Sequence, residues 1–188
     1  MDFKEIKSEI LKRAKEKNAC VEEYKKAYLS KSMQDLCNII KNNFYWCINN
    51  SVLTIELLEE NKELFAENQI YCNINASSGY CLASDSATVE ASGSATVEAS
   101  GSVTVRAYDS VTVEAWGSAT VRAYDSVTVR AYDSVTVEAS GSAYIYSNYI
   151  VECKLSDNAI YRLLNENKIF YVSDSIVFEK QYIDNQSV

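Results

Sequence analysis

Residues 102–117 read SVTVRAYDSVTVEAWG and contain two consecutive variants of one eight-residue motif. The motif runs without an insertion from residue 86 to residue 141, and a degenerate copy, SAYIYSNY, follows at 142–149. In each octad Ala or Val occupies positions two, four and six, and larger or polar residues stand between them. Because successive side chains of a strand point to opposite faces, this alternation predicts one short β-strand per octad.

The pairs Gly-Ser and Asp-Ser that separate the strands are typical of corners where a chain turns. A strand of about five residues buries too little apolar surface to be stable alone, so neighbouring repeats must stack. The hairpins of a barrel or sandwich favour Asn-Gly, or Gly in the first loop position, and only some of these corners carry Gly there. The repeats therefore favour a parallel β-solenoid over a barrel or a sandwich.

The charged residue at position five of each octad distinguishes two sizes of solenoid coil. Adjacent coils lie about 4.8 Å apart, so unlike charges stacked in a ladder stabilise it and like charges destabilise it. A coil of two octads brings three unlike pairs together, whereas a triangular coil of three octads brings only one. We therefore expect a 16-residue coil, with a 24-residue coil as the alternative. The two expected ladders are Glu90, Arg106, Arg122 and Glu138 on one face, and Glu98, Glu114 and Arg130 on the other.

Residues 1–75 lack the repeat and carry apolar side chains at helical spacing, which predicts a small helical head. Four helices are expected, at 2–17, 21–28, 32–48 and 54–65. Side chains that can bond the first backbone amides of a helix mark two of these starts. They are Ser32, in a capping box with Asp35, and Thr54.

The chain after the repeats is rich in aromatic residues, and its strand-like segments AYIYSNYIV, AIYRLL, KIFYV and SIVF look out of register with the octads. We interpret this region as irregular β-coils and a cap that shields the last edge strand. The predicted fold class is therefore α+β, with a helical head at 1–75, the octapeptide β-solenoid at 76–149 and a strand-rich cap at 150–188.

The composition argues against catalysis and against a bound cofactor. The chain contains no His, so it lacks the commonest general base near neutral pH. Its six Cys residues form no CxxC pair, and neither a GxSxG motif nor a phosphate-binding glycine loop occurs. We therefore expect no enzymatic activity, no catalytic residue, no metal site and no cofactor, and we expect free, mostly buried thiols.

The net charge of −8 argues against nonspecific binding to nucleic acid or to anionic membranes, which require clustered Lys and Arg. An acidic chain can instead imitate nucleic acid, yet three Arg residues interrupt the Glu ladders of the repeats. The segment MDFKEIKSEI at the start is charged, and no apolar run is long enough for a signal peptide or a membrane span. A cytoplasmic location is therefore expected.

Outward Tyr, Trp and Arg side chains form the best interaction surface that the sequence predicts. In the 16-residue coil the rings gather in the middle of the solenoid on both faces. These residue types often anchor protein interfaces, although such rings can also serve only to stack on one another. The candidate interaction residues are Arg106, Tyr108, Trp116, Arg122, Tyr124, Arg130 and Tyr132.

The octads SATVRAYD and SVTVEAWG, together with the phrase LKRAKEKNAC in the head, resemble a group of largely uncharacterised proteins of bacteriophages, prophages and gut bacteria. In that group a short helical head precedes repeats of this type. The resemblance is close over residues 86–141, weak over the head and does not extend to the tail. It implies a mobile-element origin and a β-solenoid, and it carries no established activity.

Small acidic phage proteins without catalytic groups are often inhibitors of host defence, including anti-CRISPR proteins, and this analogy sets the leading hypothesis. We expect a non-catalytic binding protein that occupies a host protein, such as a CRISPR effector or another defence nuclease, or its nucleic-acid groove. Sequence-specific nucleic-acid binding and membrane binding are not expected. The alternatives are a structural spacer that self-associates into a homo-oligomer, and an acidic mimic of nucleic acid.

Overall fold

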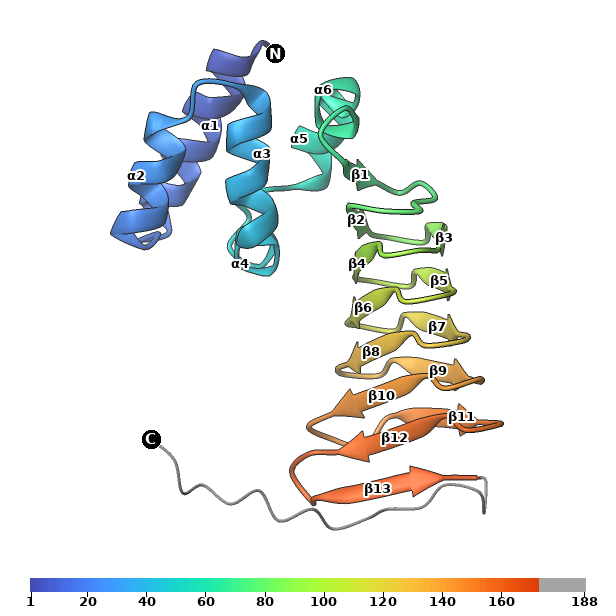
Figure 1. Ribbon diagram of the computed structural model, residues 1–188. Helices are drawn as coiled ribbons and strands as arrows, with labels where there is room; N and C mark the ends of the chain where they lie inside the picture. The colour runs from blue at the N-terminus through green and yellow to red at the C-terminus, as the bar shows by residue number, and fades with distance from the viewer. Residues whose placement is uncertain (173–188) are drawn as a thin grey trace, which may run out of the picture.

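The computed structural model describes residues 1–172 and shows a helical head beside the upper part of a column of stacked strands (Figure 1). The mixed α+β class and the order of head and solenoid are as the sequence predicts. The head contains six helices in the described residues. They are α1 (Phe3–Glu16), α2 (Val21–Leu29), α3 (Met33–Asn42), α4 (Phe44–Asn49), α5 (Ile55–Glu60) and α6 (Lys62–Ala66).

Asparagine side chains divide two of the expected helices. The helix expected at 32–48 is interrupted at Asn43, whose side-chain amide donates to the carbonyl of Ile39 at 2.9 Å. The helix expected at 54–65 is interrupted at Asn61, which donates in the same way to Leu57 at 2.9 Å. Short polar side chains compete for helical carbonyls in this manner, and the expectation of two continuous helices was therefore wrong.

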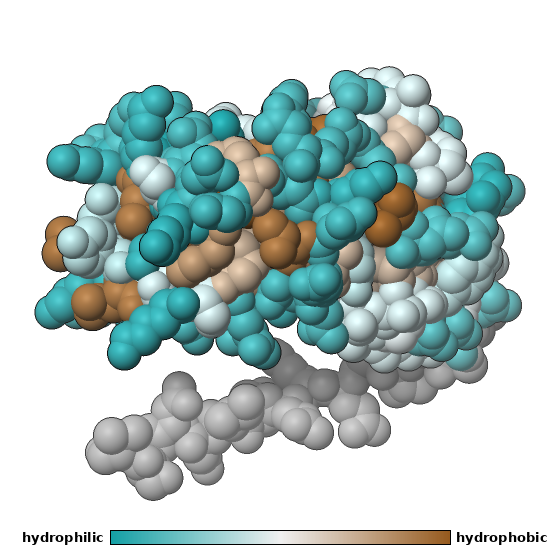
Figure 2. Space-filling view, turned by 90° about the horizontal axis from the view of Figure 1, so that it is seen from above, coloured by the Kyte–Doolittle hydropathy of each residue, from teal (hydrophilic) through white to brown (hydrophobic). Residues whose placement is uncertain are grey.

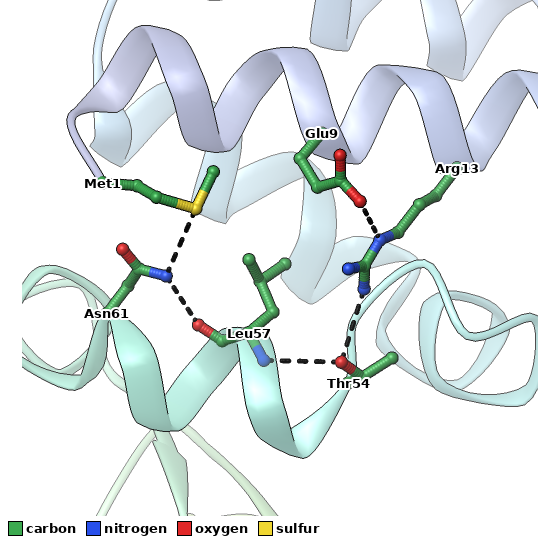
Figure 3. A network of polar contacts seen from close by, with 6 residues as sticks. All are labelled: Met1, Glu9, Arg13, Thr54, Leu57 and Asn61. Atoms are coloured by element: carbon green, nitrogen blue, oxygen red, sulfur yellow. Dashed lines mark hydrogen bonds and ion pairs between the residues drawn. The ribbon is translucent and has the colours of Figure 1, made fainter.

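The expected N-caps are confirmed, and one of them also joins the first helix to the fifth. Ser32 and Asp35 form the capping box of α3, and the Thr54 hydroxyl accepts from the amide of Leu57 at 3.4 Å. Arg13 of α1 donates to the same hydroxyl at 3.3 Å and pairs with Glu9 at 2.7 Å (Figure 3). The network holds α1 across the start of α5.

The solenoid consists of two sheets that face each other across an Ala and Val core (Figure 1). Sheet A contains β1 (Ile70–Cys72), β2 (Tyr80–Ala83), β4 (Thr96–Ala99), β6 (Thr112–Ala115), β8 (Thr128–Ala131), β10 (Tyr144–Ser147), β12 (Ile160–Leu163) and β13 (Lys168–Tyr171). Sheet B contains β3 (Thr88–Ala91), β5 (Thr104–Ala107), β7 (Thr120–Ala123), β9 (Thr136–Ala139) and β11 (Glu152–Leu155). Consecutive octads therefore alternate between the sheets.

The register confirms the coil of two octads. In sheet B, Val105 lies opposite Val89 on one side and opposite Val121 on the other, and all three are fully buried. Each partner lies two octads away in the chain, which excludes the alternative coil of three octads. The inward Val and Ala and the outward Thr, Glu, Arg and aromatic residues lie on the faces that the alternation predicts.

The coil continues past the octads, so the expectation that the tail strands leave the register was wrong for those nearest the repeats. Ile145 of β10 lies opposite Tyr161 of β12, and Cys153 of β11 lies opposite Val137 of β9, with the same spacing as between the octads of one sheet. Larger side chains simply take the places of Val and Ala. The strand β13 then pairs antiparallel with β12 and caps sheet A, whereas the expected strand SIVF lies outside the described residues.

The boundary between head and solenoid is a shared core. Strand β1 lies within the range 1–75 expected for the head, yet it pairs with β2 in sheet A. Ile70 of β1 and Leu82 of β2 are buried in the same cluster as Ile10 and Leu36 of the head. The first strands of the solenoid therefore anchor the head.

The backbone conformation of the corners explains why position eight of the octads is either Gly or Asp. Both residue types adopt positive φ there, for example 59° at Asp109 and 69° at Gly117, a region that favours Gly and tolerates Asp. Where an Asp lies one coil after a Gly, its carboxylate accepts a hydrogen bond from the backbone amide of that Gly. The three bonds are Gly93 to Asp109 at 2.9 Å, Gly117 to Asp133 at 3.1 Å and Gly141 to Asp157 at 3.2 Å.

Candidate functional site

The predicted charge ladders are present on the outer faces of both sheets. On sheet B, Arg106 lies 3.5 Å from Glu90, and Arg122 lies 2.9 Å from Glu138. On sheet A, Arg130 lies 4.0 Å from Glu114. All three pairs are at least partly exposed, so each stabilises the fold by at most about 1 kcal/mol. Their main effect is to hold the charged side chains of each face in defined positions.

The aromatic ladders are also where the repeats place them, one on each sheet. The rings of Tyr108 and Tyr124 stack beside sheet B, with centroids 5.0 Å apart and planes 10° apart. Trp116 and Tyr132 stack beside sheet A at 5.2 Å and 8°. The guanidinium of Arg130 lies 5.0 Å from the centre of the Tyr132 ring, within the range of a cation–π contact.

The helical head covers one of these two ladders. Tyr45 of α4 stacks on Trp116 with centroids 5.8 Å apart, and the neighbouring Phe44 contacts Tyr80 of β2 at 4.9 Å. Figure 1 shows α3 and α4 beside the sheet A strands. Tyr45 was not among the residues predicted from the sequence. The one hint was the apolar run FYWCI, which is hydrophobic around the whole of a short helix and so needs contacts on two sides.

The seven candidate residues therefore separate into two groups. Trp116, Arg130 and Tyr132 belong to the ladder beside the head on sheet A. Arg106, Tyr108, Arg122 and Tyr124 are half-buried on sheet B, and among residues 1–172 no helix lies over them (Figure 1). We call these four residues the sheet B quartet.

A buried carboxylate lies on sheet A. Glu98 is only 3 % exposed, and its Oε2 has no hydrogen-bond partner within residues 1–172. Burial, together with the neighbouring carboxylate of Glu114, raises the pKa of Glu98 to about 8, and Arg130 opposes this shift. Burial also raises the pKa of Glu114, again opposed by Arg130. No feature of the octad sequence distinguishes Glu98 from its exposed equivalents.

The buried thiols and the hollow beside β1 are further candidate sites in residues 1–172. Burial raises the pKa of Cys37 and of Cys47 to about 12, which makes both poor nucleophiles. No group of three or more His, Cys, Asp or Glu side chains in this part of the chain is placed to hold a metal ion. A hollow of about 600 Å³ lies between α5, α6 and β1, lined in part by Lys62, Glu63 and Ile74.

The fold and these surfaces define a two-sided β-solenoid with a docked helical head. No protein-family model, no curated protein and no solved structure matches this chain. Within residues 1–172, none of the helices combines the length and the apolar character needed to cross a membrane.

Proposed function

We propose that the protein is a non-catalytic binding protein that engages a host protein through the sheet B quartet. The observation that carries this proposal is the pair Arg106 and Arg122, which are directly opposite each other in the sheet B register. Two like charges one coil apart destabilise a ladder unless an anion lies between them. Within residues 1–172, their Glu partners lie on the outer sides, at Glu90 and Glu138.

The quartet combines this positive pair with a flat aromatic surface. Tyr108 and Tyr124 follow the two Arg residues in their octads, so the rings and the guanidinium groups form adjacent columns. A partner that places a carboxylate against the Arg pair and an apolar or aromatic side chain against the rings would satisfy both columns. Buried Tyr and Arg residues of this kind supply most of the energy of many interfaces.

The covered face of sheet A shows how such a ladder holds an aromatic side chain. There the ring of Tyr45 extends the stack of Trp116 and Tyr132 by one member. A ring from a partner protein would stack on the Tyr108–Tyr124 pair in the same way. The face of the molecule seen from above is mostly hydrophilic, with separate small hydrophobic areas (Figure 2). This face is therefore less suitable for docking a partner than the sheet B quartet.

The biological role that we propose is inhibition of a host defence system, in the manner of an anti-CRISPR protein. This part rests on the resemblance of the octads to phage and prophage repeats, and on the absence of His from the chain. In this role the quartet would occupy an acidic surface of a defence nuclease in the cytoplasm of the bacterial host and would block its groove. No cofactor is needed for such a mechanism.

The two alternatives make different use of the same surfaces. A mimic of nucleic acid needs one sign of charge along a face, whereas Arg residues interrupt both Glu ladders and Glu98 is buried. A self-assembling spacer would associate through the solenoid ends. Light scattering of the purified chain at increasing concentration tests that alternative, because a spacer forms larger species and a simple binder stays monomeric.

The test of the proposal is capture of partners from host lysate by the full-length chain and by two matched double variants. Tyr108→Ala with Tyr124→Ala removes the open ladder, and Trp116→Ala with Tyr132→Ala removes the covered one. We expect the first variant to lose a stoichiometric partner that the second retains. Retention of the partner by the first variant, or the lack of any stoichiometric partner, would overturn the proposal.

A further inference from the structure

The octad SATVEASG occurs twice in succession, at 86–93 and at 94–101, and its two glutamates have opposite environments. Glu90 lies on sheet B, where its side chain is 51 % exposed and pairs with Arg106. Glu98 lies on sheet A and is 3 % exposed. Since the local sequence is identical, the difference must come from the surroundings of the two strands. β3, which carries Glu90, is the edge strand of sheet B, whereas β4, which carries Glu98, lies between β2 and β6 and beside the head.

The part of the head beside β4 is helix α4. Phe44 contacts Tyr80 on β2, and Tyr45 contacts Trp116 directly after β6. The strand order in sheet A is β2, β4, β6, so β4, which carries Glu98, lies between the two contacts. Glu98 is also opposite Leu82, a member of the head core. The helix thus bridges the coil that carries the carboxylate.

The neighbours of Glu98 do not compensate a negative charge. On sheet A the residue opposite is Glu114, and in the described part of the chain neither carboxylate has a hydrogen-bond partner for its Oε2. Among residues 1–172, the opposing positive charge is Arg130, which lies a further coil away and is 4.0 Å from Glu114. From the head, the titratable group beside this cluster is the phenol of Tyr45, near Tyr132. An ionised Glu98 would be a buried charge beside a second carboxylate.

We propose that docking of the head on sheet A is coupled to protonation of Glu98, so that the head is a proton-sensitive cover of the second aromatic ladder. The protonated carboxyl is compatible with the closed contact of α4, whereas the ionised one favours separation and access of water. Trp116 and Tyr132 are half-buried while the head is docked, and release of the head exposes them further, so that they present a second binding face like the sheet B quartet.

The direction of the pH dependence follows from the two states. The pKa of Glu98 rises from its ordinary value of 4.5 to about 8 when the head is docked. The docked state therefore holds the proton more tightly, and docking is strongest below the ordinary value. It weakens by up to about tenfold for each pH unit across this window and becomes independent of Glu98 above it.

The experiment is hydrogen–deuterium exchange of α4, residues 44–49, in the full chain from about pH 5 to about pH 9, corrected for the intrinsic pH dependence of exchange. We expect protection of these amides to fall as the pH rises. Glu98→Gln, which keeps the shape of the side chain and cannot ionise, should make protection independent of pH. The matched variant Glu90→Gln, in the identical octad, should behave as the wild type does.

A second readout separates release of the head from fraying of α4. With Trp46→Phe, Trp116 is the single Trp of the chain, and its emission should shift to longer wavelength as the pH rises and should stay constant when Glu98→Gln is added. Circular dichroism would detect a loss of structure in Glu98→Gln. In that case Glu114→Gln replaces it: this variant removes the carboxylate that helps to raise the pKa of Glu98, so the pH-dependent change in protection and emission should move to lower pH. Protection and emission that do not change with pH in the wild type, or an unchanged slope in Glu98→Gln, overturn the proposal.

Discussion

The carboxylate of Asp109 accepts a hydrogen bond from the backbone amide of Gly93, one full coil earlier in the chain, at 2.9 Å. Both residues have positive φ, 59° in each case. The side chain thus bonds a corner of the same shape as its own, and this repeats at Asp133 and Asp157. On both edges of the solenoid, corners are thus linked along the axis by bonds that do not belong to the sheets.

Substitutions of Asp109 should separate the contribution of this bond from that of the backbone conformation. Asp109→Gly keeps positive φ and loses the bond, so we expect a loss of about 0.5–1 kcal/mol, because the bond is exposed. Asp109→Ala also loses the bond but keeps a Cβ in the left-handed corner without the polar group that helps Asp to tolerate this conformation, so it should be about 1–2 kcal/mol less stable than Asp109→Gly. Urea unfolding measures both values. Equal stability of the Gly and Ala variants would contradict the assignment.

Truncation of an inward valine should destabilise the solenoid far more than truncation of its outward neighbour. Val121 is fully buried between Val105 and Val137 of the neighbouring coils. Val121→Ala removes two methyl groups and leaves a cavity, so we expect the free energy of unfolding to fall by about 2–3 kcal/mol. Thr120→Ala, on the same strand but facing outward, should change stability by less than about 0.5 kcal/mol. Thermal and urea unfolding compare the pair, and similar losses would contradict the inward and outward assignment.

The contact of Tyr45 with Trp116 predicts a specific effect on the head. Tyr45→Ala removes the ring that extends the sheet A ladder and should weaken docking by about 0.5–1.5 kcal/mol, with a red shift of Trp116 emission. Tyr45→Phe should retain the stack. Tyr28→Ala, on the exposed side of α2, is the matched control and should leave the emission unchanged.

Thiol reactivity should separate the exposed cysteine from the buried ones. Cys20 is exposed, whereas Cys37, Cys47 and Cys81 are buried, and burial raises the pKa of Cys81 to about 11. A thiol-reactive dye at neutral pH should therefore label Cys20 first and the three buried thiols only after unfolding. Mass spectrometry of digested protein identifies the labelled sites. Rapid labelling of Cys37 in the folded chain would contradict the packing of the head.

The solenoid was predictable because one period carries several independent patterns. The spacing of Val105 and Val121, the pairing of Arg122 with Glu138 and the stack of Tyr108 on Tyr124 all follow from a repeat of two octads per coil. The solenoid was predicted to end with the degenerate octad at 142–149, and the regular continuation into β11 and β12 was missed since Cys153 and Tyr161 replace the small residues that made the period visible.

The position of the head was not predictable from the same sequence. The contact of Tyr45 with Trp116 joins residues far apart in the chain, and no repeat relates them. The breaks at Asn43 and Asn61 depend on side-chain bonds that compete with good helical spacing. The difference between Glu90 and Glu98 arises in identical octads, so only the tertiary structure can assign it.

The alternation of octads between two sheets limits how the repeat array can change its length. Loss of a single octad would transfer every later strand to the opposite sheet, so that Tyr124 would leave the open face and Tyr132 would join it. Loss of two octads keeps every later side chain on its own face and only shortens the column. A change in the number of repeats is therefore compatible with the present surfaces in steps of two octads, and a step of one octad exchanges the two faces of the protein.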